Sequence, residues 1–113
     1  MYRIVATDMD ETFLNAEHNV SQTNVDAILR MRELGVLFVP TSGRPYGSIM
    51  ESLRDMPPAC LEGSYVISYN GGCINRAGED EPIFSTRMPF ATIEQLFEHA
   101  KSVGDVGMHF YAL

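Results

Sequence analysis

The sequence is poor in cysteine and in basic residues, and both shortages exclude classes of protein. Cys60 and Cys73 are its two cysteines, which are too few and too isolated for a disulfide framework or a zinc site. We therefore expect two reduced thiols. Eight Lys and Arg residues stand against 15 Asp and Glu, giving a net charge of −7. Because no basic stripe is present to neutralise phosphates, nucleic acid is not the expected main partner.

Long apolar segments are also missing. No apolar run approaches the ~20 residues that span a bilayer. The N-terminus has no basic segment followed by an apolar stretch and a cleavage site. We therefore expect a cytoplasmic protein without membrane association. The 113 residues, 45% apolar and 20% charged, are enough for one small soluble domain with its own core.

Strand-like and helix-like segments alternate through the first seventy or so residues. Three apolar runs predict strands, of which the first two are expected to be buried: residues 2–7, 36–39 and 65–69. A helix is expected over residues 22–34, with Ser21 as its N-cap and Gly35 as its stop. A second helix is expected after Pro45, which suits a first turn. This alternation predicts an α/β fold with a Rossmann-like parallel sheet and right-handed crossovers.

The rest of the chain has a weaker pattern. Residues 73–75 are expected to pair back on the third strand as a hairpin, and residues 78–82 form the most linker-like stretch. Three elements are expected after it: a strand over residues 83–88, a helix from a Thr92–Gln95 capping box to Gly104, and a strand over residues 107–111.

Two carboxylates follow the first predicted strand. Asp8 and Asp10 lie at its C-terminal end, where open α/β sheets place their ligands. A divalent cation, or a proton held on one of them, would relieve their repulsion. Asp8 can attack phosphorus to form an aspartyl phosphate, and Asp10 can protonate a leaving oxygen. Thr12 can fix the turn through its hydroxyl, and backbone N–H groups of the loop, from Met9 onward, can hold phosphoryl oxygens.

A second candidate site follows the second predicted strand. There Thr41 and Ser42 precede a glycine at a helix N-terminus, a good cradle for an anion. Ser42 can donate to a phosphoryl oxygen, and Gly43 lets the backbone approach closely. Arg44 can contact phosphate or pair with a surface acid, and the sequence leaves both open. The structural alternative for the segment is a helix cap with a turn glycine.

A third loop should reach the same edge of the sheet. Asn70 and Gly71 follow the third predicted strand, and Asn70 can contact a ligand, although an Asn-Gly pair is also an ordinary turn. The three histidines show no ligand spacing and receive no role. We expect Asp8 and Ser42 to share one rim of the sheet and to bind a phosphorylated ligand together.

Taken together, these segments resemble the haloacid dehalogenase (HAD) superfamily, and in detail its Cof-like branch of sugar-phosphate phosphatases. The resemblance rests on three segments at the expected order and spacing: Asp8–Leu14, Thr41–Pro45 and Ile67–Gly72. It implies that residues 1–81 are the N-terminal part of a HAD-like core. Residues 82–113 would begin an inserted, mobile α/β cap that supplies specificity.

The resemblance also implies roles for the site residues. Asp8 would be the nucleophile and Asp10 the acid/base, while Ser42 would bind the transferring phosphoryl group. The Asp8 carboxylate and the Asp10 main-chain carbonyl would bind Mg²⁺. The implied function is a Mg²⁺-dependent phosphohydrolase of a small, sugar-phosphate-like metabolite, acting through an aspartyl phosphate.

The sequence departs from the family pattern in two respects. Glu11 stands where this branch usually has glycine. The family's downstream lysine and acidic pair are not reached, and Lys101, the only lysine, lies on the predicted cap helix. The resemblance therefore covers only the N-terminal portion of such an enzyme. We predict that this chain binds Mg²⁺ weakly and turns over slowly or not at all, because one carboxylate and one carbonyl leave water to complete the octahedral shell.

Two other interpretations remain. The chain can be an inactive or regulatory piece that pairs with another chain, and the unpaired edges of an incomplete sheet would also favour self-association. Alternatively, it can be a non-enzymatic phospho-acceptor signalling module. That class needs an acceptor Asp at the end of the third strand, where this sequence has Ser68, Tyr69 and Asn70.

Overall fold

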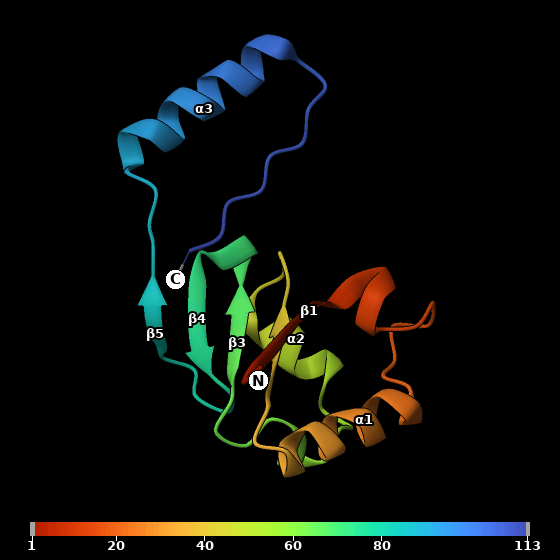
Figure 1. Cartoon of the computed structure of the whole chain (residues 1–113). Helices are drawn as coiled ribbons and strands as arrows, with labels where there is room; N and C mark the ends of the chain where they lie inside the picture. Colours follow the sequence, from red (N-terminus) through yellow and green to blue (C-terminus); the bar gives the residue numbers. More distant parts are fainter. Residues whose placement is uncertain (1, 113) are drawn as a thin grey trace.

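A computed structural model describes residues 2–112 of the chain. One sheet runs in the order β1-β2-β3-β4-β5 (Figure 1). The strands are β1 Ile4–Asp8, β2 Leu37–Thr41, β3 Tyr65–Ser68, β4 Cys73–Arg76 and β5 Pro82–Ser85, and the α-helices are α1 Gln22–Glu33, α2 Tyr46–Ser52 and α3 Phe90–Val103. β1, β2 and β3 are parallel, whereas β4 and β5 extend the sheet by antiparallel pairing. The predicted α/β class, its parallel strands and the hairpin after β3 are confirmed.

The hydrophobic core lies between the sheet and the helices α1 and α2. Because β1, β2 and β3 follow one another in chain order, right-handed crossovers put both connecting helices on the same face. The core cluster joins Ile28 of α1, Ile49 of α2 and Phe38 of β2. Strand β2 is buried on both faces, as its apolar run predicts, with Phe38 and Val39 only 2% and 4% exposed.

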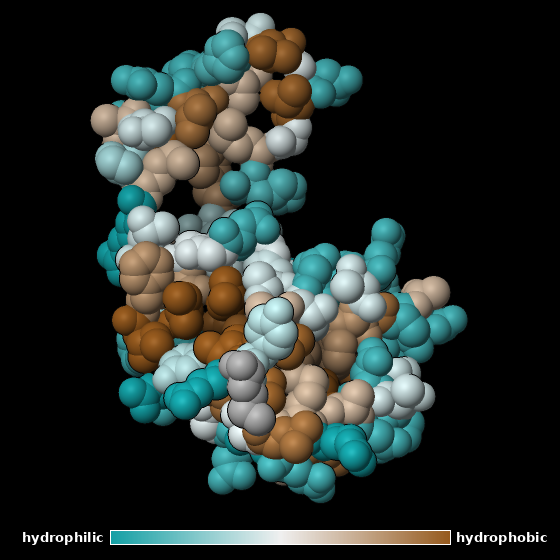
Figure 2. Space-filling view, in the orientation of Figure 1, coloured by the Kyte–Doolittle hydropathy of each residue, from teal (hydrophilic) through white to brown (hydrophobic). Residues whose placement is uncertain are grey.

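Strand β1 is more exposed than its sequence predicts. It lies at one edge of the sheet, and Ile4 and Val5 are 54% and 40% exposed. The prediction of a buried strand is therefore wrong here. Burial needs neighbours on both sides, and within residues 2–112 only β2 pairs with β1. Figure 2 shows other apolar side chains at the surface, over the strands and along α3.

Helix ends follow the sequence where the capping signal is strong. The Ser21 hydroxyl accepts the N–H three residues on, at 3.2 Å, and Gly35 adopts a φ of 72° beyond α1; both were predicted. Helix α3, however, begins at Phe90, with Pro89 as its N-cap and no side-chain cap. The predicted capping box is wrong, because Thr92 already lies in the first turn and donates its N–H to the Pro89 carbonyl at 3.0 Å.

Helix α3 stands away from the sheet (Figure 1), and none of its residues is buried. The strand predicted over residues 107–111 is wrong. Residues 104–112 form no strand or helix, because their alternating apolar residues have no partner strand within the described part of the chain. The segment instead returns to the sheet, where the Tyr111 ring centroid lies 5.4 Å from that of Tyr69.

Strand β5 lies just beyond the boundary predicted between core and cap at residues 81 and 82. It ends at Ser85 rather than residue 88, and it pairs with β4 in the sheet. The division into a core and a cap stays a prediction. No helix formed by residues 2–112 combines the length and the apolar character needed to cross a membrane.

Candidate active site

The three parallel strands end at one rim of the sheet. Asp8, the last residue of β1, is the register partner of Thr41, the last residue of β2. Ser42 comes next, and its backbone N–H donates to the Ile67 carbonyl of β3 at 3.0 Å. The loops that follow β1, β2 and β3 therefore meet, as the carboxyl ends of parallel strands should.

The chain turns sharply after Asp8. Residues Met9–Phe13 form a helical turn in which Asp10 has extended backbone angles and Glu11 is left-handed, with a φ of 56°. The Met9 side chain is fully buried, so Met9 offers a ligand only its backbone. Asp8 and Thr12 are exposed at the rim.

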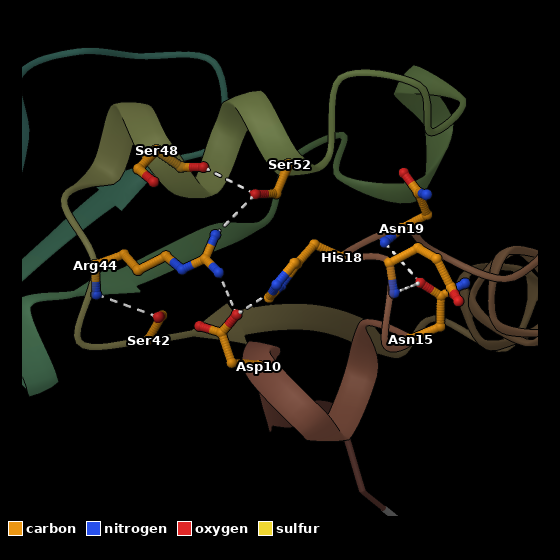
Figure 3. A network of polar contacts seen from close by, with 9 residues as sticks. Asp10, Asn15, His18, Asn19, Ser42, Arg44, Ser48 and Ser52 are labelled. Carbon is orange, nitrogen blue, oxygen red and sulfur yellow. Dashed lines mark hydrogen bonds and ion pairs between the residues drawn. The ribbon is translucent and has the colours of Figure 1, made fainter.

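Asp10 is held by two basic side chains (Figure 3). The guanidinium of Arg44 donates from Nη2 to Asp10 Oδ1, and Nδ1 of His18 lies 3.5 Å from the same oxygen. The side chains of Arg44 and Asp10 are 29% and 38% exposed. No other ion pair or hydrogen bond reaches the Asp10 carboxylate within residues 2–112. In the described part of the chain, its second oxygen, Oδ2, therefore has no hydrogen-bond or ion-pair partner.

Arg44 is itself fixed from the far side. Its Nη1 donates to Ser52 Oγ at 3.1 Å, and Ser52 in turn donates to the Ser48 carbonyl, also at 3.1 Å (Figure 3). The sequence left open whether Arg44 contacts phosphate or pairs with an acid, and in the structure it pairs with an acid. That acid is Asp10 of the candidate site.

The side of the rim opposite the turn after Asp8 is formed by the loops that follow β2 and β3. It contains Ser42, Gly43 and Asn70. Ser42 is 5% exposed, and its Oγ accepts the Arg44 backbone N–H at 3.2 Å. A Cβ added to Gly43 would lie 3.1 Å from Oδ1 of Asn70, so the glycine permits a close approach of the two loops. Gly71, with a φ of 91°, completes the turn after β3. The predicted site residues of all three loops are thus brought together, while their roles stay predictions.

The rim has only a few oxygen atoms that could serve as Mg²⁺ ligands. The Asp8 carboxylate and the Asp10 main-chain carbonyl are hard oxygen ligands of the kind that Mg²⁺ takes, and they would supply two of its roughly six positions. Within residues 2–112, no three His, Cys, Asp or Glu residues cluster as a metal site. Lys101 is not at the rim, since it lies on α3 with its Nζ 3.2 Å from Glu98.

Sequence reasoning missed His18 and Ser52. His18 follows Asp10 by eight residues and has no ligand spacing to any other histidine, so only the folded turn brings it to the carboxylate. The signal that could have found it is the pair Asn15 and Asn19, turn-forming residues that fold the chain back. Ser52 is the last residue of α2, and Arg44 lies in the loop just before that helix. The long arginine side chain spans the eight residues between them along the helix surface.

Comparison with known proteins gives a consistent result. A model of the haloacid dehalogenase-like hydrolase family matches residues 5–113. The Bacillus subtilis protein named "Putative phosphatase YxeH" is 31% identical over 111 residues, which is 98% of this chain and 40% of that protein. Pyridoxal phosphate phosphatase YbhA of Escherichia coli is 27% identical over 101 residues, 86% of this chain and 36% of that protein.

Solved structures give the same picture. BT1666 from Bacteroides thetaiotaomicron, described among phosphatases of the HAD superfamily, superposes with a TM-score of 0.74 at 26% identity. The superposition covers 91% of this chain and 36% of BT1666. The chain therefore spans about two fifths or less of the length of these relatives.

Proposed function

Because this chain belongs to the haloacid dehalogenase-like hydrolase family, we propose that it carries the phosphoryl-transfer residues of a Mg²⁺-dependent phosphohydrolase. The family expected from the three sequence motifs is confirmed. The activity of the relatives comes to this chain as a proposal, since the chain covers 40% of the first relative's length.

One observation carries the proposal: Asp8 and Thr41 are register partners at the ends of β1 and β2, so the carboxylate and the Ser42 hydroxyl share a rim. The Asp8 carboxylate is exposed and can attack the phosphorus of a monoester. The Ser42 Oγ accepts the Arg44 backbone N–H, which leaves its own proton free to donate to a phosphoryl oxygen. Backbone N–H groups of the turn after Asp8 can hold the remaining oxygens.

Asp10 suits the role of acid and base. Its Oδ1 is taken by Arg44 and His18, so Oδ2 is the oxygen that can carry a proton. From that oxygen Asp10 would protonate the leaving alcohol and then deprotonate the water that cleaves the aspartyl phosphate.

Mg²⁺ held by the Asp8 carboxylate and the Asp10 carbonyl would neutralise charge on the phosphoryl group. With two protein oxygens, we expect the chain to bind Mg²⁺ weakly. Calorimetric titration of the chain with Mg²⁺ checks this, and tight binding would contradict it.

The proposed substrate is a small phosphorylated metabolite. One relative is named for pyridoxal phosphate, which supports a compact phosphate monoester over a phosphorylated macromolecule. Within residues 2–112 the rim is formed by short loops, and α3, which lies in the segment predicted to begin the cap, has no buried residue. The identity of the metabolite would depend on that cap.

The experiment is phosphate release from p-nitrophenyl phosphate in the presence of Mg²⁺. Because the chain is expected to turn over slowly, the assay uses a high protein concentration, and we expect Asp8→Asn to abolish whatever release the wild type shows. Asp26→Asn is the matched control, because Asp26 is an exposed acid on α1 whose carboxylate accepts a hydrogen bond from Gln22, outside the candidate site. Equal release by the wild type and Asp8→Asn would remove Asp8 as the nucleophile.

A second candidate function is a piece that acts only with a partner chain. Within residues 2–112 β1 pairs only with β2, and Ile4 and Val5 are 54% and 40% exposed. This favours the second candidate, because an unpaired apolar strand edge accepts another strand. Native mass spectrometry combined with the phosphate-release assay would distinguish the two. Release by a monomer supports the first proposal, and release found only when the chain is in an assembly supports the second. A phospho-acceptor module is not favoured, since β3 ends at Ser68 with no acid before Gly71.

A further inference from the structure

The proposed function gives no task to His18, whose imidazole lies beside Asp10 (Figure 3). We propose that His18 is a positioning residue for Asp10: together with Arg44 it fixes the Oδ1 atom and thereby directs Oδ2 toward the proton transfer. The catalytic consequence rests on the proposed function. The contact between the two side chains does not.

A tight turn delivers His18 to this place. The His18 backbone N–H donates to the Asn15 carbonyl at 2.9 Å, and the Asn15 backbone N–H donates to the Asn19 carbonyl at 3.0 Å. The Asn15 side chain closes the turn, because its Oδ1 accepts the backbone N–H groups of Glu17 and Asn19 at 3.1 Å and 2.8 Å. The loop is therefore held by its own hydrogen bonds and does not depend on the imidazole.

The backbone of His18 is in a costly conformation. Its φ is 58°, in the left-handed region that holds a few per cent of residues other than glycine, with histidine among the commoner of them. Such conformations persist where the surroundings fix them, and they gather at functional sites. The His18 side chain is 66% exposed, so burial does not explain its presence. Within residues 2–112 the imidazole makes its polar contact with Asp10.

Two side chains contact one oxygen of Asp10 and restrict how the carboxylate can turn: Arg44 donates a hydrogen bond to Oδ1, and Nδ1 of His18 lies within ion-pair distance of it. Arg44 approaches from the loop before α2 and donates to Ser52, whereas His18 approaches from the loop between β1 and α1. Rotation of the Asp10 carboxylate would break both contacts, so the pair preorganises its second oxygen. The 3.5 Å separation from Nδ1 is long for a hydrogen bond, and catalytic hydrogen bonds are often long before substrate binds.

A hydrogen bond from His18 to Asp10 requires one particular tautomer of the imidazole. A neutral imidazole carries one N–H, and to donate to Asp10 it must carry that proton on Nδ1. Long-range ¹H–¹⁵N NMR correlations distinguish the two tautomers, under conditions where the rings are neutral. We expect His18 to carry its proton on Nδ1 in the wild type and to shift to Nε2 in Asp10→Ala. His99, an exposed residue of α3, is the internal control and should not change.

Kinetics test the consequence. His18→Gly suits the left-handed backbone and removes the ring, while His18→Asn also tolerates that backbone and keeps an N–H donor. For p-nitrophenyl phosphate we expect His18→Gly to lower kcat about tenfold or more with little change in KM, and His18→Asn to recover most of the loss. His99→Ala should match the wild type.

Each outcome decides the inference. His18 in the Nε2 tautomer in the wild type, or a tautomer unaffected by Asp10→Ala, would overturn it. An unchanged kcat in His18→Gly would overturn it as well. If the wild-type chain releases no phosphate, the proposed function of the isolated chain fails, and the tautomer of His18 alone decides whether it positions Asp10.

Discussion

The main-chain carbonyl of Ser42 accepts the backbone N–H of Asn70 at 3.1 Å. This bond joins the loop after β2 to the turn after β3. The neighbouring residues tighten the same junction, since Tyr69 donates its N–H to the Arg44 carbonyl at 3.2 Å. This side of the candidate site is therefore built from backbone, with Gly43 at its closest point to Asn70.

Gly43→Ala tests this close approach. The new Cβ would lie 3.1 Å from Oδ1 and 3.2 Å from Nδ2 of Asn70, so the Asn70 side chain must move. We expect a coupling of about 0.5–1 kcal/mol between Gly43→Ala and Asn70→Ala in a double-mutant cycle, measured by urea unfolding. The alanine should cost less once the Asn70 amide is gone.

Gly47→Ala is the matched control for that cycle. Gly47 lies in α2, and nothing is within 4 Å of an added Cβ. It should raise the free energy of unfolding by about 0.5–1 kcal/mol, because alanine favours a helix over glycine. Its effect should be the same with or without Asn70. Equal coupling at both glycines would mean that Gly43 and Asn70 are not in contact.

Glu11→Gly should stabilise the protein. Glu11 has a φ of 56° and is exposed, and glycine adopts that conformation without steric cost. We expect the free energy of unfolding to rise by about 0.5–1 kcal/mol. Glu17→Gly is the control, because Glu17 is also exposed but does not have a positive φ. It should be neutral or destabilising, and a stabilising effect of equal size there would contradict the explanation.

Arg44→Gln should destabilise the fold more than Arg54→Gln. Arg44 joins Asp10 to Ser52 and its side chain is 29% exposed, whereas Arg54 pairs with Glu51 at side-chain exposures of 65% and 68%. We expect losses of about 0.5–1 kcal/mol for Arg44→Gln and near zero for Arg54→Gln. Urea unfolding at low and high salt measures both. Equal losses would show that the Arg44 network adds no more to stability than the exposed pair of Arg54 and Glu51.

Cys60 gives a pH dependence with a definite sign. Burial raises the pKa of the Cys60 thiol above its ordinary 9.0, and the nearby charge of Arg32 opposes this in part. The stability from the buried neutral thiol is therefore complete below that ordinary value and is lost as the pH rises through the folded-state pKa. Wild-type protein should lose more stability than Cys60→Ala over that alkaline range. Parallel losses in urea unfolding would refute this.

The parts of the fold that the sequence predicted are those fixed by local residues. Ser21 and Gly35 set the ends of α1 through a side-chain oxygen and a positive φ, and both effects act within one turn. The burial of β2 also followed from its apolar run, because β2 has a neighbour strand on each side. The exposure of β1 and the missing strand over residues 107–111 depend on which partners are present, and local sequence carries no such information.

One part of the candidate site could also be predicted from the sequence, and another part could not. The register of Asp8 with Thr41 follows from two strands ending in parallel, so the shared rim was predictable from their sequence positions. The pairing of Asp10 with His18 was not, because it depends on how the turn between residues 15 and 19 folds back. Its hydrogen bonds lie within the turn, but the direction of the imidazole is a tertiary outcome.

The most direct test of the whole account is to trap the aspartyl phosphate. The chain is incubated with Mg²⁺ and p-nitrophenyl phosphate and treated with borohydride, which reduces an acyl phosphate to the alcohol, and the modified residue is located by peptide mass spectrometry. We predict homoserine at position 8 in the wild type and none in Asp8→Asn. Reduction at a different carboxylate, or phosphate release with no reduction at Asp8, would contradict the account.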